Sequence, residues 1–136
     1  NVHKNDINIE VNGNVFSKPW NPMNNQYRWY LAEREDDLNQ VGCIYTAQGL
    51  DFDYTGVIWW NDLKWNKYNQ EWEVNQHLIK DPTFKKIIYE NKLTNEDIKE
   101  YILNSYRILL TRALKGLRIW FLDEDTKNHF EENFNI

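Results

Sequence analysis

The sequence of 136 residues predicts an α/β domain with a mostly parallel central sheet and added β-hairpins. Short apolar segments rich in β-branched residues alternate with amphipathic helical segments along the chain, which is typical of a layered α/β sheet. The expected order is hairpin, helix, two strands, hairpin, two helices, strand and helix. The chain length suits one core, so we expect residues 1–136 to form a single domain.

The first expected elements are a hairpin and a helix. Residues 7–16 alternate apolar and polar side chains around Asn12-Gly13, which is the signal for a hairpin with a tight two-residue turn. Asn21-Pro22 supplies an N-cap followed by a proline at the first helical position. A one-sided apolar stripe follows, so we expect a helix that continues to about residue 35.

The middle of the chain contains two predicted buried strands, at residues 41–45 and 56–60. The connection between them, from 46 to 54, is short for a parallel crossover. Gly49 is expected to permit it, because glycine tolerates a positive φ. Residues 62–74 form two short alternating runs, which predict a second hairpin.

The last part of the chain predicts three helices and one strand, and each helix begins at a capping residue. The caps are Asp81, which precedes Pro82, then Thr94, which forms a capping box with Asp97, and finally Asp123. The helices are expected at about 82–90, at 95 to near Gly116, and at 124–132. Glycine is a common C-cap, so Gly116 is taken as the end of the second helix. Residues 117–122 predict a buried strand.

The composition excludes several classes of protein. Hydrophobic residues make up 41% of the chain, with seven Trp and eight Tyr, so disorder is not expected. The net charge of −5 argues against a uniformly basic nucleic-acid binder but is compatible with a local basic patch. No apolar run reaches the roughly 20 residues that span a bilayer, so no membrane partner is expected. Cys43 is the only cysteine, which is consistent with a reducing cytoplasm.

The abundant Trp residues have a structural and a functional interpretation. Trp59, Trp60 and Trp120 lie in predicted core strands and are expected to fill volume. Trp65 and Trp72 lie in a polar hairpin and are better candidates for an exposed contact surface. Such a surface could stack on single-stranded nucleic acid or bind a protein. A sugar-binding face is the weaker alternative, because the α/β order does not suit the usual β-sandwich.

Few of the usual catalytic signals are present. Asp51 and Asp53 could be paired carboxylates, although solvated loop acids are the more common case. The three histidines show no ligand spacing, so no metal site is expected. Neither GxxxxGK[ST] nor GxGxxG occurs, so the isolated chain is not expected to bind a nucleoside triphosphate well. Arg112 is either a surface side chain favoured by the helix dipole or a group that reaches a phosphate.

Two segments become more specific when they are taken together. "CIYTAQGLDFDYTGVI" at 43–58 is followed by "YRILLTRALKGLRIW" at 106–120. In this order they resemble the C-terminal part of bacterial Schlafen group 3-like DNA/RNA helicase-type ATPases, which are P-loop proteins related to superfamily 1 helicases. The upstream "KPWN" and the segment around Trp29 are also similar to that family. The resemblance covers most of residues 15–122.

The resemblance implies a three-layer RecA-like domain of the helicase C-terminal type, the second of two that enclose a nucleotide. The first domain carries the P-loop, so this chain would be a fragment of a longer protein, which the absent initiator Met also suggests. The implied cofactor is ATP with Mg, bound mainly by the first domain, and none is expected in the isolated chain. The implied partners are that N-terminal RecA-like domain of the same polypeptide and DNA or RNA.

The resemblance also implies roles for individual residues. Gln48 and Gly49 match the Gln-Gly of a motif that lines the cleft between the domains, with Gln48 counted among the catalytic residues. Asp51 stands beside the ribose of ATP, where the family usually has the longer Glu. Thr111 and Arg112 match the last helicase motif, whose Arg reaches the γ-phosphate as an arginine finger.

Three further residues, Thr46, Lys115 and Arg107, are candidates for nucleic-acid or phosphate contacts. Thr46 is the expected contact to nucleic acid, while Tyr45 replaces the His of many relatives. Lys115 and Arg107 could add phosphate contacts or be solvated. The predicted function is therefore the second RecA-like domain of an ATP-dependent helicase or translocase, inactive by itself. The alternative is a non-enzymatic module that uses the Trp65 and Trp72 hairpin to bind single strands or a protein.

Overall fold

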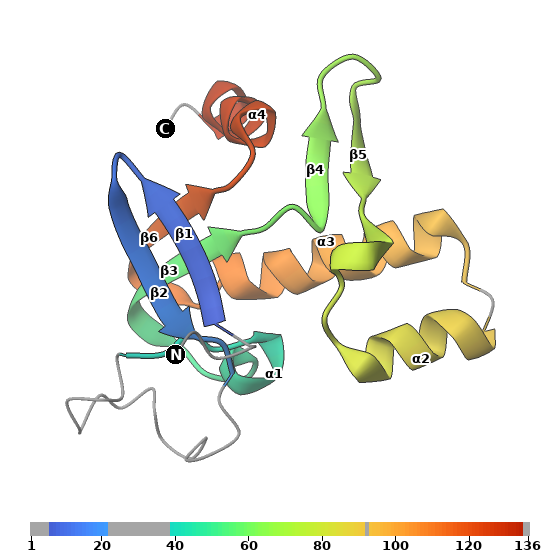
Figure 1. Cartoon of the computed structure of the whole chain (residues 1–136), viewed down its shortest axis with the longest axis horizontal. Helices are drawn as coiled ribbons and strands as arrows, with labels where there is room; N and C mark the ends of the chain where they lie inside the picture. The colour runs from blue at the N-terminus through green and yellow to red at the C-terminus, as the bar shows by residue number, and fades with distance from the viewer. Residues whose placement is uncertain (1–5, 22–38, 92, 135–136) are drawn as a thin grey trace. The chain divides into compact units, whose positions relative to one another are not determined.

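The computed structural model describes residues 6–21, 39–91 and 93–134. The chain divides into two compact units, residues 1–50 and residues 51–136. Both units contain helices and strands, so the fold is mixed α/β (Figure 1). No helix in the described ranges is long and apolar enough to cross a membrane.

The first unit begins with the predicted hairpin. Strands β1 (Asp6–Val11) and β2 (Asn14–Pro19) pair in antiparallel fashion. The turn residues Asn12 and Gly13 have φ angles of 51° and 77°, the positive values that a tight two-residue turn requires. The hairpin prediction is confirmed. The helix predicted from Asn21 to about residue 35 falls on 22–38, outside the described residues.

The strand predicted at 41–45 is wrong. Val41 makes a single parallel bridge with Trp20, and the chain then enters helix α1 (Ile44–Ala47). Thr46 decides this change, because its hydroxyl accepts a hydrogen bond from the Cys43 amide at 2.9 Å and donates to the Cys43 carbonyl at 3.0 Å. This closes a capping box around the first turn of the helix. The apolar residues of "VGCIY" are compatible with a strand or a helix, and the side-chain cap favours the helix.

The second unit is built on one parallel pair of strands. Strand β3 (Phe52–Trp59) pairs with β6 (Ala113–Phe121), with Val57 opposite Ile119. The strands predicted at 56–60 and 117–122 are therefore confirmed, but each begins earlier than the apolar pattern indicates. The first positions of both strands mix apolar with polar residues and include the exposed Asp53 and Lys115, so they show no continuous apolar run.

The helix predicted to end near Gly116 ends sooner. Helix α3 (Asn95–Leu110) stops at the cap residue Thr111, and Gly116 lies within β6. The confirmed start of α3 is the Thr94 capping box, in which the Asp97 amide donates to Thr94 Oγ1 at 3.2 Å. Gly116 has a different role from the predicted one, because a Cβ there would lie 2.9 Å from the ring of Tyr54 on the neighbouring strand.

The remaining elements of the second unit surround this pair. They are β4 (Leu63–Asn66), β5 (Glu71–Val74), the 3-10 helix η2 (Gln76–Leu78), α2 (Pro82–Asn91) and α4 (Glu124–Phe134). Strands β4 and β5 form the predicted second hairpin. The predicted caps at Asp81 and Asp123 are also confirmed, since each carboxylate accepts from amides of the first helical turn.

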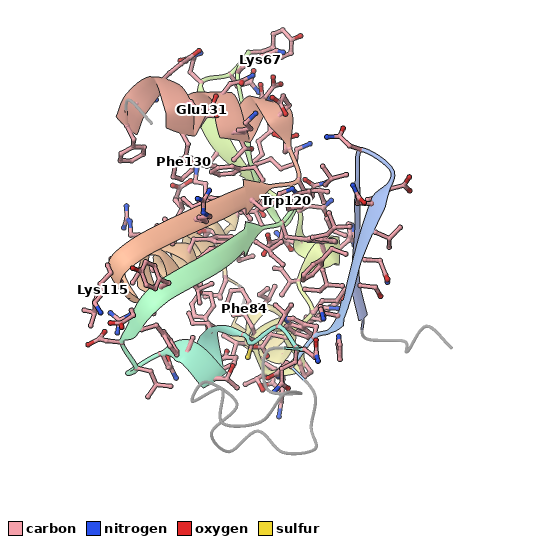
Figure 2. All side chains as sticks on the ribbon, turned by 90° about the vertical axis from the view of Figure 1, so that its left-hand side faces the viewer. Lys67, Phe84, Lys115, Trp120, Phe130 and Glu131 are labelled. Carbon is pink, nitrogen blue, oxygen red and sulfur yellow. The ribbon has the colours of Figure 1, made fainter. Side chains whose placement is uncertain are left out.

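The core of the second unit is apolar and aromatic. Buried residues from β3, β4, α2, α3 and α4 form one cluster. Figure 2 shows Phe130 on the side of α4 that faces the strands, while Lys115 lies at the other end of β6. Trp59 is 2% exposed at the centre of this cluster, as predicted, whereas Trp60 and Trp120 are half-buried.

A mostly parallel central sheet is not seen in the described part of the chain. Its strands form three two-stranded sheets, of which only β3–β6 is parallel. The replacement of the 41–45 strand by α1 removes one of the parallel strands that the sequence predicts. The mixed α/β class is therefore confirmed, but no continuous sheet and no three-layer RecA-like arrangement is seen among these residues.

Candidate functional site

The candidate site of the second unit lies where the parallel strands begin. Asp51 immediately precedes β3, and Arg112 immediately precedes β6. Because the strands are parallel, their amino ends lie at one edge, and the Phe52 amide donates to the Arg112 carbonyl at 2.8 Å. The side chains meet there as well, since Arg112 Nη1 lies 3.4 Å from Asp51 Oδ1.

The Arg112 guanidinium is fixed in place by further contacts. Its Nε donates to the Ile108 carbonyl at 3.1 Å, and its Nη2 donates to Thr111 Oγ1 at 3.3 Å. Ile108 lies in the last turn of α3, where carbonyls have no partner within the helix. The side chain is 24% exposed. Arg112 is therefore a half-buried cation whose orientation is set before any ligand binds.

Thr111 explains why α3 ends where it does. Its hydroxyl bonds back to the carbonyls of Arg107 and Ile108, at 2.9 and 3.1 Å, and its amide also donates to Arg107. These bonds satisfy carbonyls of the last helical turn. The chain can then turn into β6 with Arg112 at the corner. Thr111 and Arg112 thus act as one local unit at the end of the helix.

A second ion pair lies close to the first along the same strands. Lys115 Nζ lies 2.8 Å from Asp53 Oδ2, and these side chains are 60% and 59% exposed. Exposed pairs of this kind contribute little to stability. Arg107 is also exposed and donates to Asn104 Oδ1 at 2.9 Å. Both cations that could add phosphate contacts are therefore on the surface of this unit.

The other motif residues belong to the first unit. Thr46 and Tyr45 lie on α1, where Thr46 is used in the helix cap and Tyr45 is exposed. Gln48 is the exposed C-cap of α1, and its amide donates to the Ile44 carbonyl at 2.8 Å. Gly49 has a φ of 78°, so the expected positive φ is confirmed. The residues that the structure brings together are thus Asp51, Thr111 and Arg112.

The Trp hairpin is packed more tightly than the sequence indicates. Trp65 and Trp72 are opposite one another in β4–β5, and both are half-buried rather than exposed. The Trp65 ring stacks on His129 of α4 at 3.6 Å between centroids, and Trp72 lies 5.4 Å from Trp59 in the core. The expectation of an exposed Trp surface is therefore wrong. Helix α4 supplies the cover, and the sequence contains no local signal that it would dock there.

Partial burial also affects the ionisation of His129. Removal of its ring from water lowers its pKa below the ordinary value, and the nearby Glu132 only partly opposes this effect. The imidazole is therefore held towards its neutral form beside Trp65. A neutral ring stacked on an indole contributes packing rather than a positive charge for nucleic acid.

The charges around the hairpin are balanced by acids. Lys64 pairs with Asp123 at 2.9 Å, and Lys67 pairs with Asp125 at 2.9 Å. On α4, Lys127 pairs with Glu124 at 3.2 Å. The lysines near the Trp rings are therefore neutralised by carboxylates of α4 and its cap. Such a surface does not attract a polyanion.

A buried polar pair that the sequence does not indicate lies at the other end of β3. The Tyr106 hydroxyl donates to Asp62 Oδ1 at 2.7 Å and accepts from the Trp60 amide at 3.0 Å. Burial raises the pKa of the Asp62 carboxyl, with the Tyr106 bond partly opposing it. Burial and the neighbouring carboxylate raise the pKa of Tyr106 well above its usual value. The residues are far apart in sequence, so no motif connects them.

The described ranges contain no group of three His, Cys, Asp or Glu side chains that could hold a metal ion. The polar groups that the structure does assemble are instead one guanidinium, one hydroxyl and one carboxylate at the start of β3 and β6. A guanidinium with a fixed orientation suits an anion with oxygen acceptors, such as a phosphate.

Comparison with known proteins identifies the family. Residues 1–123 match the family model "Schlafen group 3, DNA/RNA helicase domain". The uncharacterized protein YPL245W of Saccharomyces cerevisiae is 31% identical over 119 residues, which cover 85% of this chain and 25% of that protein. The chain thus spans about a quarter of the length of this relative. No solved structure matches the chain. Because the match includes both motifs, the chain belongs to the Schlafen group 3 DNA/RNA helicase domain family.

Proposed function

We propose that this chain is the second RecA-like domain of an ATP-dependent helicase or translocase, and that it supplies an arginine finger to a nucleotide held by another domain. The observation that carries the proposal is the half-buried Arg112, fixed by Ile108 and Thr111 at the edge of the parallel pair. A cation that is oriented in advance stabilises charge that develops on a transferred phosphoryl group. The membership of the helicase domain family supports the same function.

Arg112 lies at the amino ends of the strands, and this position supports a reaction in which two domains take part. Open α/β sheets bind their own ligands beyond the carboxyl ends of their strands. Arg112 and Asp51 lie instead at the amino ends of β3 and β6, while aromatic side chains fill the carboxyl ends. The proposed nucleotide therefore belongs to a neighbouring RecA-like domain of the same polypeptide. In that assembly β3 and β6 would form part of a three-layer sheet.

The residues of this chain have limited tasks in the proposed reaction. ATP with Mg, bound mainly by the first domain, supplies the phosphoryl group. Arg112 donates to the γ-phosphate oxygens when the domains close, with Thr111 orienting its guanidinium. Gln48 and Gly49 line the cleft, and Thr46 contacts DNA or RNA. Because the finger arrives only on closure, hydrolysis depends on domain movement, which couples ATP turnover to motion along a strand. The proposed location is the cytoplasm.

The test is Arg112→Ala in a protein that carries this chain together with its P-loop domain. We expect the rate of ATP hydrolysis to fall by about 10³-fold or more, because arginine fingers contribute on the order of 10³ to 10⁵. Affinity for ATP, measured with a fluorescent analogue, should change little. Arg118→Ala is the matched control, since Arg118 is an exposed arginine of β6. Unchanged turnover of the Arg112 variant would contradict the proposal.

The binding-module alternative has less support. Trp65 and Trp72 pack against His129 and the core, and acids surround them. If this alternative were right, the chain would bind single strands in a salt-dependent manner, and the double variant Trp65→Ala with Trp72→Ala would lose that binding without unfolding. We expect no binding to single strands that depends on Trp65 and Trp72.

A further inference from the structure

We propose that Asp51 is a positioning residue that retains the Arg112 guanidinium on its own domain until a phosphate competes for it. The inference rests on the proposed function of Arg112. It assigns Asp51 to the arginine rather than to the ribose of ATP. The carboxylate and the guanidinium lie 3.4 Å apart, at the start of adjacent parallel strands.

The other contacts of Arg112 make the carboxylate the exchangeable partner. Nε and Nη2 bond to Ile108 and Thr111, which belong to the end of α3 and therefore move with the arginine. Asp51 belongs to the segment before β3 and is 60% exposed. An external anion can therefore approach the position of this carboxylate without disturbing the helix. A phosphate takes the same kind of charge-assisted bond and carries more negative charge.

The Arg112–Asp51 ion pair is weak enough for a phosphate to displace the carboxylate. Charge-assisted N–H···O bonds in strong pairs measure about 2.7–2.9 Å, and the Arg112–Asp51 separation is longer, at 3.4 Å. Pairs with an exposed member contribute little free energy. The carboxylate therefore biases the position of the guanidinium without locking it. A γ-phosphate in a water-excluded cleft competes successfully.

Asp53 provides a matched control within the same segment. It carries the same side chain, is equally exposed at 59%, and pairs with Lys115 at 2.8 Å. Asp51→Asn and Asp53→Asn therefore make the same change of charge two positions apart. Only the first removes the carboxylate that pairs with Arg112. Asp51→Glu restores the charge with a longer side chain.

The kinetic test compares these variants in the protein that carries the P-loop domain. The finger acts in the transition state, so removal of its competitor should raise kcat and leave the KM for ATP unchanged. We expect a kcat about two- to fivefold above wild type for Asp51→Asn, the range for an exposed pair. Asp53→Asn and Asp51→Glu should match wild type. Equal values for the two Asn variants would overturn the proposal, as would a lower kcat or a raised KM for Asp51→Asn, which would indicate a ribose contact.

A spectroscopic test separates this inference from the proposed function. In the 136-residue chain, we expect the Arg112 Nη1 protons, which face Asp51, to exchange with water faster in Asp51→Asn than in wild type or Asp53→Asn. Unchanged exchange would overturn the role of Asp51. If Arg112→Ala retains ATP hydrolysis, the proposed function fails by itself, and the exchange rates still decide whether Asp51 holds Arg112. Thermal unfolding of each variant excludes loss of the fold as the cause.

Discussion

The two ends of the β3–β6 pair differ in what occupies them. At the carboxyl end, Trp59 stacks on Tyr106 with 4.0 Å between ring centroids and packs against Phe121 and Phe130. At the amino end, Asp51 and Arg112 form an ion pair that is partly open to solvent. The end that usually binds ligands in α/β sheets is therefore filled by core, and the opposite end carries the polar groups.

This difference assigns separate tasks to the two kinds of unusual residue in the sequence. The aromatic side chains at the carboxyl end hold β3, α3 and α4 together. The charged side chains at the amino end contribute less to stability, because exposed pairs are weak. Substitutions at the carboxyl end should therefore change the free energy of unfolding, and substitutions at the amino end should change the reaction.

Trp59→Ala tests the carboxyl end with the largest expected effect on stability. The ring is 2% exposed, and its Nε1 donates to the Leu63 carbonyl at 2.8 Å. We expect the free energy of unfolding to fall by about 3–5 kcal/mol, as for other buried aromatic truncations. Urea unfolding followed by circular dichroism measures it. Trp120→Ala, at a half-buried position of β6, should cost less. A loss below about 1 kcal/mol for Trp59→Ala, far under that range, would show that the carboxyl end is not the core.

Thr126→Val tests how α4 is attached to the hairpin. Thr126 is fully buried, and its hydroxyl accepts from the Trp65 amide at 2.9 Å and donates to Asp123 at 2.7 Å. Valine keeps the shape but leaves a buried amide without a partner. We expect a loss of about 1–3 kcal/mol in the free energy of unfolding. Thr83→Val, at an exposed position of α2, serves as the control and should change stability little. Equal stabilities of the two variants would mean that α4 is held by its rings alone.

The Asp62–Tyr106 pair should give the carboxyl end a pH dependence of its own. The pKa of Asp62 is raised in the folded chain, so this carboxyl binds its proton more tightly there than in the unfolded chain. Its contribution to stability is full below the unfolded pKa of 3.8 and is lost as pH rises through the folded pKa. The slope is at most about 1.4 kcal/mol per pH unit.

Asp62→Asn isolates this contribution. The amide oxygen can still accept from Tyr106, but it does not titrate. We expect the stability difference between wild type and the variant, measured by urea unfolding from pH 4 to 7, to shift in favour of the variant as pH rises. Asp97 is the internal contrast, because bonds from Thr94 lower its pKa, so its contribution is lost as pH falls. A difference that is constant with pH would mean that Asp62 titrates normally.

The smallest expected change in stability belongs to the amino end. Arg112→Ala and Asp53→Asn should each lower the free energy of unfolding by about 1 kcal/mol or less. The same urea titrations measure this. The Arg112 variant should nevertheless lose ATP hydrolysis, so its effect on the reaction is separate from its small effect on stability. If Arg112→Ala unfolded the chain, the two ends would not differ in the way described above.

The elements that the sequence predicts well are those with local signals. Asn12-Gly13 fixes the first hairpin, and Thr94 with Asp97 fixes the start of α3, because each signal lies within a few residues of its effect. The end of α3 was not predictable from periodicity, since Leu109 and Ala113 continue the apolar spacing into β6. The stop depends on the Thr111 hydroxyl, whose bonds to helix carbonyls do not alter the apolar pattern.

The candidate site divides in the same manner. Arg112 and Asp51 are identified from their motifs, but their mutual contact is not, because the two residues come from separate segments that meet only when β3 and β6 pair. The burial of Trp65 was missed for the same reason. It depends on α4, whose His129 reaches the ring from a distant part of the chain. Long-range docking has no short sequence signature.

The pairing of β3 with β6 also has a consequence for solubility. In the described part of the chain each of these strands has one neighbour, so each presents a row of backbone donors and acceptors along its other side. Such edges can join strands of other molecules and start aggregation. The exposed Arg118 on β6 opposes this, because a charged side chain on an edge strand disfavours pairing with the same strand of a second copy. Arg118 therefore disfavours association between copies along β6.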